Sequence, residues 1–172
     1  IKDSNGIDVV HLSLDSKGNV DLQELETYLQ DGTPTLVSLM HANNEIATLL
    51  PLAEVAQLCR LYGAYFHSDT VQTMGHYHFD LASLDIDFIT CAAHKFHGPK
   101  GIGFLYVNKK TRVNPLIHGG SQERGLRGGT ENIAGVVGLA KAIELAYIDL
   151  EEHQQHVWGL KSYMMTRLQA LF

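Results

Sequence analysis

A lysine that follows an apolar run is the residue in this sequence best suited to covalent chemistry. Residues 87–92 are apolar enough for a buried strand, and the chain then breaks into a glycine-containing turn that carries Lys95. This places Lys95 at the end of a strand, where open α/β sheets bind their ligands. Apolar walls would disfavour the ammonium form and leave a neutral amine able to form a Schiff base with a carbonyl. An ordinary solvated lysine is the alternative interpretation.

Polar side chains also follow two earlier predicted strands. Asn44 comes after one of them, and Asp69 with Gln72 comes after the next. Because parallel strands end at one edge of a sheet, we expect these residues to share a cleft with His94 and Lys95. A lysine that binds an aldehyde and a carboxylate that holds a protonated ring nitrogen are the groups that a pyridoxal 5'-phosphate site requires. A cap or turn role is the alternative for Asp69, because Asp69 and its neighbours also suit a helix start.

The elements that must position these residues alternate as in a doubly wound α/β domain with a mostly parallel sheet. The proline-free stretch 132–172 has helical spacing and predicts two helices or one long bent helix. The last strand follows its predecessor closely, so we expect it to be antiparallel or at an edge. Strands are predicted at 8–14, 35–40, 65–68, 87–92 and 102–107, and earlier helices over 22–29 and 51–62.

Composition excludes several classes of function. The net charge is -6, the pI is about 5.9, and no basic run exceeds two residues. This balance argues against nucleic acid or an anionic membrane as the main partner. No apolar stretch is long enough to cross a bilayer, and two cysteines suit a reducing, cytoplasmic setting. The first residue is not methionine, so we expect the sequence to be an interior part of a longer protein.

Neither cysteine is a convincing nucleophile or metal ligand. Cys59 falls in a predicted helix and Cys91 in a predicted strand, without disulfide or zinc spacing. Burial would raise the pKa of the Cys91 thiol and leave it inert, so a packing role is favoured.

Histidine-based metal binding is a weaker alternative, and we predict no metal site. The candidate ligands do not show the spacing of helical metal ligands, and no cysteine supports them. They are His76, His78 and Asp80, or His94 and His97. A glycine-lysine segment at 100–103 has the wrong order for a nucleotide-binding loop.

Four motifs in order resemble the pyridoxal phosphate-dependent cysteine desulfurases of the aminotransferase class V group. Together they cover most of the chain, which makes the resemblance specific. They are His41–Ile46, His67–Gln72, Ala93–Gly101 and Gln122–Asn132.

The resemblance implies a role for each candidate residue around the cofactor. Lys95 is similar to the lysine that binds the cofactor aldehyde, and Asp69 to the partner of the pyridine nitrogen. Gln72 resembles the donor to the ring hydroxyl, and His94 a phosphate contact. Asn44 is similar to the asparagine that contacts the ring hydroxyl and the substrate carboxylate.

The resemblance also implies an assembly and a reaction. Thr130 resembles the residue that crosses a dimer interface to the neighbouring cofactor phosphate, so a homodimer with shared sites is implied. The implied reaction removes sulfur from L-cysteine and gives L-alanine and an enzyme persulfide. That sulfur would pass to a sulfur-acceptor scaffold protein for iron–sulfur cluster or thio-cofactor assembly.

The chain departs from the family pattern in two ways. Ala92 stands where the family usually has a phosphate-binding serine. The family's upstream phosphate loop, ring-stacking histidine, mobile-loop cysteine and carboxylate-binding arginine have no counterpart. We therefore expect residues 1–148 to be part of a cofactor-binding large domain of the aspartate aminotransferase-like fold type I. Residues 149–172 would then be a helix leading toward a small domain.

Alone, such a chain is predicted to be inactive. A selenocysteine lyase or another class V aminotransferase is the alternative within the same fold. A non-catalytic dimerisation or scaffold module is the alternative from a different class.

Overall fold

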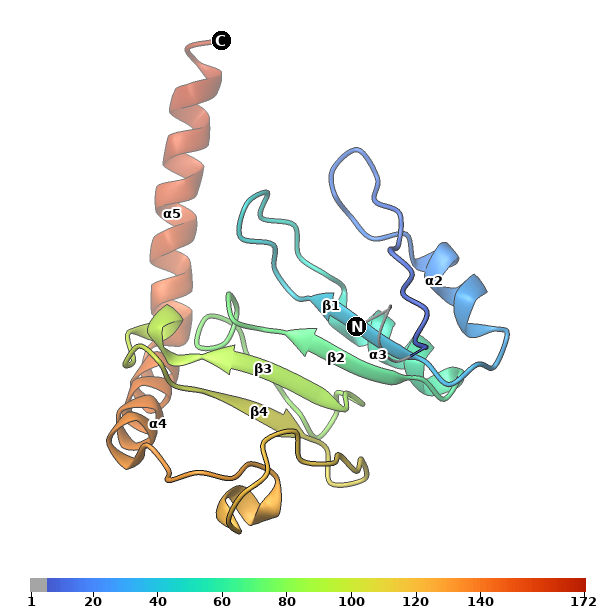
Figure 1. Cartoon of the computed structure of the whole chain (residues 1–172). Helices are drawn as coiled ribbons and strands as arrows, with labels where there is room; N and C mark the ends of the chain where they lie inside the picture. Colours follow the sequence, from blue (N-terminus) through green and yellow to red (C-terminus); the bar gives the residue numbers. More distant parts are fainter. Residues whose placement is uncertain (1–5) are drawn as a thin grey trace.

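A four-stranded sheet forms the centre of the computed structural model, which describes residues 6–172 (Figure 1). The strands lie in the order β1-β2-β3-β4; the first three are parallel, and β4 pairs antiparallel with β3. The predicted α/β fold with a mostly parallel sheet and an antiparallel last strand is therefore confirmed. The strands are β1 (Leu36–Met40), β2 (Tyr65–Asp69), β3 (Phe88–Ala92) and β4 (Gly103–Val107).

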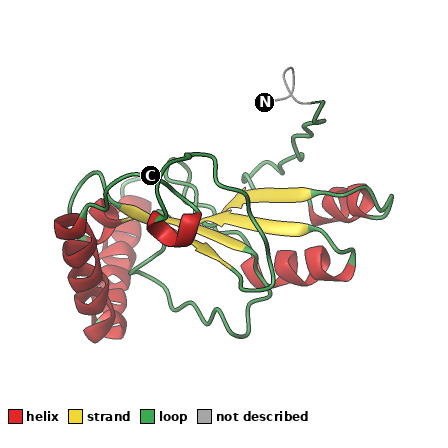
Figure 2. Cartoon of the chain, turned by 60° about the horizontal axis from the view of Figure 1, so that its bottom comes forward, coloured by secondary structure: helices red, strands yellow, loops and turns green. Residues whose placement is uncertain are grey.

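The helices lie at the two ends of the strands (Figure 2). Two helices occupy the positions predicted for the early part of the chain. The carboxyl ends of β1, β2 and β3 point toward the two helices at the end of the chain (Figure 1). Short 3-10 turns follow β3 and precede the last pair. The elements are α2 (Leu22–Leu29), α3 (Leu52–Leu61), η1 (Ala93–Phe96), η2 (Gln122–Gly125), α4 (Ile133–Ile148) and α5 (Leu150–Gln169).

Local sequence explains where these helices begin and end. The Asp21 carboxylate accepts hydrogen bonds from the backbone N–H groups of Gln23 and Glu24, which caps the start of α2. Asn132 caps α4 in the same way by accepting from Gly135. Asp149 has non-helical backbone angles and separates α4 from α5. Of the two alternatives predicted for residues 132–172, two helices or one long bent helix, the structure has two helices.

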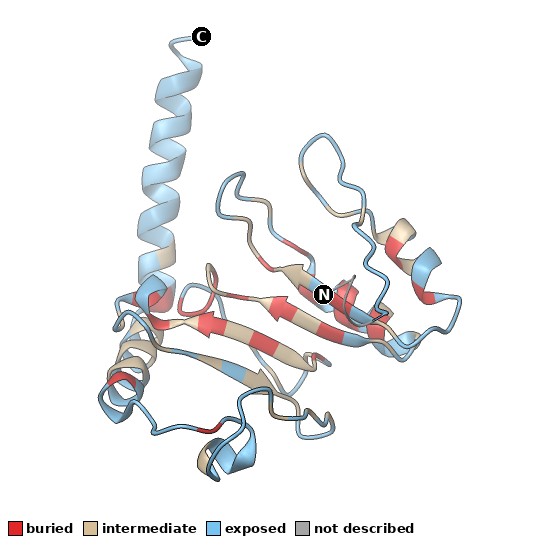
Figure 3. Ribbon diagram, viewed as in Figure 1, coloured by how far each residue is buried: buried red, intermediate tan, exposed pale blue. Residues whose placement is uncertain are grey.

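The buried core lies on one face of the sheet. Side chains alternate along each strand, so Phe66 of β2 and Ile89 of β3 point to the same face, and both are fully buried. Val55 of α3 and Leu25 of α2 belong to the same buried cluster. Burial is concentrated on the strands and on the helices beside them, whereas most of α5 is exposed (Figure 3).

The strand predicted at 8–14 is wrong. Among the described residues of that stretch, only Leu14 pairs, in an isolated bridge with Val20. Val10 and Leu14 are more than half exposed. The stretch alternates like a strand, but no neighbouring strand in the described chain takes up its hydrogen bonds, so it remains irregular.

Candidate active site

Hydrogen bonds between backbones tie the carboxyl ends of β1, β2 and β3 together. The N–H of His41, directly after β1, donates to the carbonyl of Asp69 at 2.9 Å. The N–H of Thr70, directly after β2, donates to the carbonyl of Thr90 in β3 at 3.0 Å. This edge therefore brings the turns that carry Asp69 and Lys95 into one place, as the sequence predicts.

Asp69 ends β2 with one carboxylate oxygen engaged and the other free. Its Oδ1 accepts from the N–H of Val71 at 2.9 Å, which caps the turn that follows. Within residues 6–172, Oδ2 has no hydrogen-bond or ion-pair partner. The turn interpretation of Asp69 is thus correct for one oxygen, and the second remains available for a ligand.

Lys95 lies in η1, directly after β3, and its side chain is exposed. The apolar walls expected around it are absent among the described residues, because the apolar side chains of η1, Ala93 and Phe96, point into the core instead. Within the described chain, its ammonium group takes part in no ion pair. Lys95 is therefore held through the backbone of its turn, while its side chain makes no ion pair within the described chain.

The side chain of His76 forms a hydrogen bond with the backbone of Lys95. The Nε2 of His76 lies 3.1 Å from the Lys95 carbonyl oxygen, which can only accept, so Nε2 carries the proton. The His76 carbonyl in turn accepts from Nε2 of Gln154 in α5 at 2.5 Å. A second bond, from the Tyr147 hydroxyl in α4 to the carbonyl of Tyr77 at 2.9 Å, holds the same turn. The lysine turn is thus connected to both carboxyl-terminal helices.

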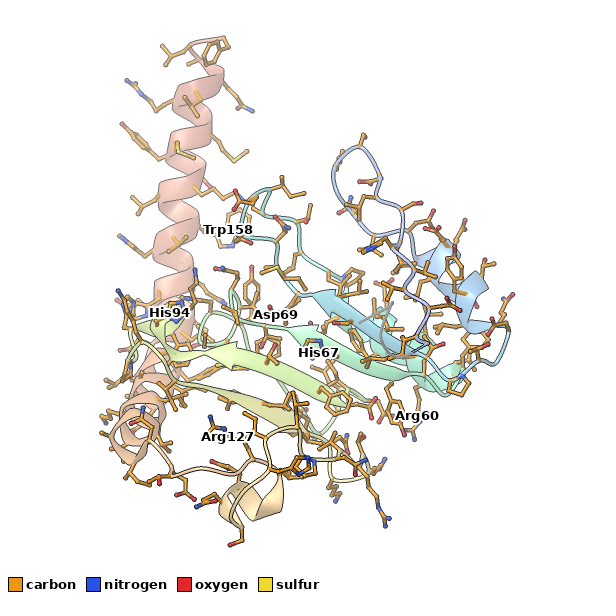
Figure 4. The ribbon with its side chains drawn as sticks, viewed as in Figure 1. Arg60, His67, Asp69, His94, Arg127 and Trp158 are labelled. Carbon is orange, nitrogen blue, oxygen red and sulfur yellow. The ribbon has the colours of Figure 1, made fainter. Side chains whose placement is uncertain are left out.

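Gln72 and His94 lie on the turns at this edge. Gln72 is half-buried in the turn after β2, and His94 is exposed in η1. Figure 4 shows His94 at the end of β3 and Asp69 at the end of β2. The structure thus brings Asp69, Gln72, His94 and Lys95 to one edge, while their roles toward the cofactor stay predictions.

Asn44 and Thr130 are not joined to this group by any bond within residues 6–172. Asn44 is exposed in the loop after β1, and its amide donates to the neighbouring Glu45 carboxylate at 2.7 Å. Thr130 is exposed on the connection from η2 to α4, which runs beyond β4 at the opposite side of the sheet from β1 (Figure 1). Their contacts with substrate and with a partner's cofactor also stay predictions.

Two histidines beside the site were missed by the sequence interpretation. His67 of β2 bonds to Ser38 of β1 and to Thr90 of β3. His41 is buried, and its Nδ1 lies 2.9 Å from the Thr73 hydroxyl. Strand alternation could have identified His67, because residues 67 and 69 of one strand face the same side and Asp69 was already a candidate.

Both cysteines are buried in the core, which confirms the packing role predicted for Cys91. Burial raises the pKa of the Cys59 thiol to about 12 and that of the Cys91 thiol to about 11. Both remain thiols near neutral pH, and a thiol is a poor nucleophile.

No three histidine, cysteine or acidic side chains gather as metal ligands would within residues 6–172. In the same part of the chain, no helix is both long and apolar enough to cross a bilayer.

Comparison with known proteins identifies a family for the chain. The aminotransferase class-V model matches residues 1–171. The cysteine desulfurase IscS of Dictyoglomus turgidum is 43% identical over 164 residues, which is 95% of this chain and 41% of the relative. A cysteine desulfurase of Nostoc sp. is 46% identical over 149 residues, covering 87% of this chain and 37% of the relative. The chain thus spans about two fifths of these relatives.

Solved structures give the same answer for the fold. A NifS-like protein, 42% identical, superposes with a TM-score of 0.90 over 98% of this chain and 47% of its own. SspA in complex with cysteine, 36% identical, gives a TM-score of 0.77 over 83% of this chain and 41% of its own. These likenesses confirm the predicted fold class. Since the family model covers nearly every residue, the chain belongs to the aminotransferase class-V family.

Proposed function

We propose that the protein carrying this chain is a pyridoxal phosphate-dependent cysteine desulfurase. It removes sulfur from L-cysteine, gives L-alanine, and leaves a persulfide on a cysteine outside this chain. The observation that carries the proposal is the free oxygen of Asp69 at the same sheet edge as the free amine of Lys95. The desulfurases among its relatives support the substrate, as does SspA, which was solved in complex with cysteine.

The donor set fits pyridoxal phosphate in chemistry. When bound, this cofactor supplies an electron sink for negative charge that develops on the substrate α-carbon. Asp69 Oδ2 would hold the protonated ring nitrogen, and Gln72 the ring hydroxyl. Lys95 would bind the aldehyde and then carry a proton to and from the α-carbon. His94 would contact the phosphate, where Ala92 offers no hydroxyl.

We also propose an oligomeric state, a partner and a cellular location for the protein. Thr130 would contact the phosphate of a neighbouring subunit, so the working protein is a homodimer with shared sites. Its exposure, and its position beyond β4 from the β1 side, support a contact outside its own site. A sulfur-acceptor scaffold protein for iron–sulfur cluster or thio-cofactor assembly would receive the sulfur, in the cytoplasm.

Replacing the lysine gives the most direct test. The intact protein with Lys95→Ala is expected to lose its visible cofactor absorbance and at least about 1000-fold of its alanine production from L-cysteine, because the covalent attachment and the proton carrier both disappear. Lys100→Ala is the matched control: Lys100 is an exposed lysine five residues away, and the variant should keep band and activity. An unchanged spectrum in Lys95→Ala would contradict the assignment.

The rival functions predict different results in the same assay. A selenocysteine lyase would turn over L-selenocysteine and leave L-cysteine untouched. Another class V aminotransferase would transfer the amino group to a keto acid and release no sulfur. A dimerisation or scaffold module would show no visible absorbance after incubation with pyridoxal phosphate. Each of these outcomes would overturn the desulfurase assignment.

A further inference from the structure

A chain of side-chain hydrogen bonds crosses three strands beside Asp69. The Nδ1 of His67 in β2 lies 2.8 Å from the Ser38 hydroxyl of β1. The Nε2 of the same ring lies 3.2 Å from the Thr90 hydroxyl of β3. One imidazole therefore connects the central strand to both of its neighbours, and we call Ser38, His67 and Thr90 the histidine clasp.

Strand register places this clasp next to the carboxylate. Ser38 is directly opposite His67, and Thr90 is directly opposite Asp69. Residues two apart on a strand face the same side, so the His67 ring and the Asp69 carboxylate lie on the same face. Figure 4 shows these two side chains as neighbours along β2. The clasp thus ends on the strand position that pairs with Asp69.

The face that carries the clasp has little packing of its own among residues 6–172. Leu36, Tyr65 and Leu105 share this face and are 59%, 52% and 54% exposed. The apolar core holds the same strands from the other side. On the exposed face, the clasp therefore adds side-chain hydrogen bonds to the backbone ladders that pair β2 with β1 and β3.

The ring itself is partly withdrawn from water. Burial lowers the pKa of His67, and the neighbouring Asp69 carboxylate opposes that change. Neutral imidazole has one donor and one acceptor nitrogen, and a hydroxyl can serve as either partner. Each ring nitrogen can therefore form a hydrogen bond with its hydroxyl, whichever of the two nitrogens carries the proton.

We infer that His67 is a positioning residue for Asp69. By adding side-chain hydrogen bonds on both sides of β2, next to the pair Asp69–Thr90, the clasp keeps the free oxygen of Asp69 where a protonated pyridine nitrogen would lie. The effect of the clasp on cofactor binding rests on the proposed function, whereas the strength of its hydrogen bonds can be tested in the protein without cofactor.

The first test uses the cofactor-free intact protein. In His67→Ala, hydrogen–deuterium exchange should become about 5- to 10-fold faster at the N–H of Thr70, which bonds to the Thr90 carbonyl across the same strands. Exchange at Val55 in the core should not change. An unchanged rate at Thr70 would overturn the inference, whatever the protein does with cofactor.

The second test measures cofactor binding. His67→Ala should weaken pyridoxal phosphate binding about 10-fold and shift the pH at which the visible band titrates, because the carboxylate is less well aligned with the ring nitrogen. Thr90→Val and Ser38→Ala each remove one end of the clasp and should give smaller losses. Combined with His67→Ala, each should add little, because all three changes break one unit.

Controls separate this inference from the proposed function. His67→Gln keeps a donor and an acceptor and should recover part of the affinity, whereas His11→Ala changes an exposed histidine outside the strands and should have no effect. If the wild type shows no visible band, the proposed function fails. If the wild type binds cofactor and His67→Ala binds it equally well with the same pH midpoint, the inference fails alone.

Discussion

The two faces of the sheet carry different kinds of side chain. On the core face, Phe66 and Ile89 are fully buried in the cluster to which side chains of α2 and α3 also belong. On the other face, Tyr65 is half exposed, and His67 and Asp69 lie at intermediate depth. Consecutive residues of β2 thus alternate between holding the fold and forming the site.

The difference separates stability from chemistry within five residues of one strand. Packing on the core face does not depend on the direction of individual contacts, but loss of side-chain volume there lowers the stability of the fold. The open face can keep a carboxylate oxygen unpaired because water and ligand reach it. Variants placed one residue apart along β2 can therefore test each property without the other.

The largest effect is expected from neighbouring aromatic residues on opposite faces. Phe66→Ala should lower the free energy of unfolding by about 3–5 kcal/mol, because it leaves a cavity in the core. Tyr65→Ala should cost about 1 kcal/mol or less, because the ring is already half exposed. Urea unfolding of the intact protein measures both. Equal losses would show that both faces are packed in the intact protein.

A smaller effect is expected from the hydroxyls at the end of β2. Ser68 Oγ is buried without a hydrogen-bond partner within residues 6–172, so Ser68→Ala should be neutral or stabilising by up to about 1 kcal/mol. Thr70 is equally buried, but its hydroxyl donates to the Thr90 carbonyl at 2.9 Å.

Thr70→Val is therefore the matched comparison. It should destabilise the protein by about 1 kcal/mol, since it removes a bond that is made. Thermal unfolding of the two variants decides the point. A loss of stability in Ser68→Ala would mean that its hydroxyl has a partner in the intact protein.

The smallest effect concerns the pH dependence of stability. Burial lowers the pKa of His41, so the unfolded chain binds more protons than the folded one below the unfolded value of about 6.5. This contribution to stability is complete above that pH and is lost as the pH falls toward the lower folded pKa.

A variant that cannot titrate isolates this contribution. His41→Asn can still bond to Thr73, so its unfolding free energy should fall less than that of the wild type between pH 7.5 and pH 5.5. Urea titrations at the two pH values measure the difference. An identical fall in both proteins would rule out His41 as the titrating group. Burial also lowers the pKa of His67. Because His67 is present in both proteins, its contribution to the pH dependence is the same in each and cancels in the comparison.

Sequence patterns predicted most of the sheet because the relevant signals are local. Apolar runs ending in polar turns located β1, β2 and β3, and the short connection to β4 indicated the antiparallel pairing. The same alternation failed at 8–14, because a strand needs a partner that its own residues do not encode.

The sequence predicted the edge at which the candidate residues lie, but not their surroundings. Residue type and strand-end position predicted Asp69 and Lys95 at one edge of the sheet, and the structure has them there. The sequence left both an apolar environment and a solvated one open for Lys95, because the walls of a cleft come from segments distant in sequence; the structure has the side chain exposed. His67 was missed because its two partners lie 29 and 23 residues away, which only strand register reveals.

The contact between His76 and the Lys95 carbonyl has a mechanical consequence. Gln154, in the first turns of α5 after the non-helical residue Asp149, donates to the carbonyl of His76. His76 in turn bonds to the carbonyl of Lys95. A displacement of α5 relative to the sheet would therefore have to break one of these two bonds or move the peptide that carries the lysine.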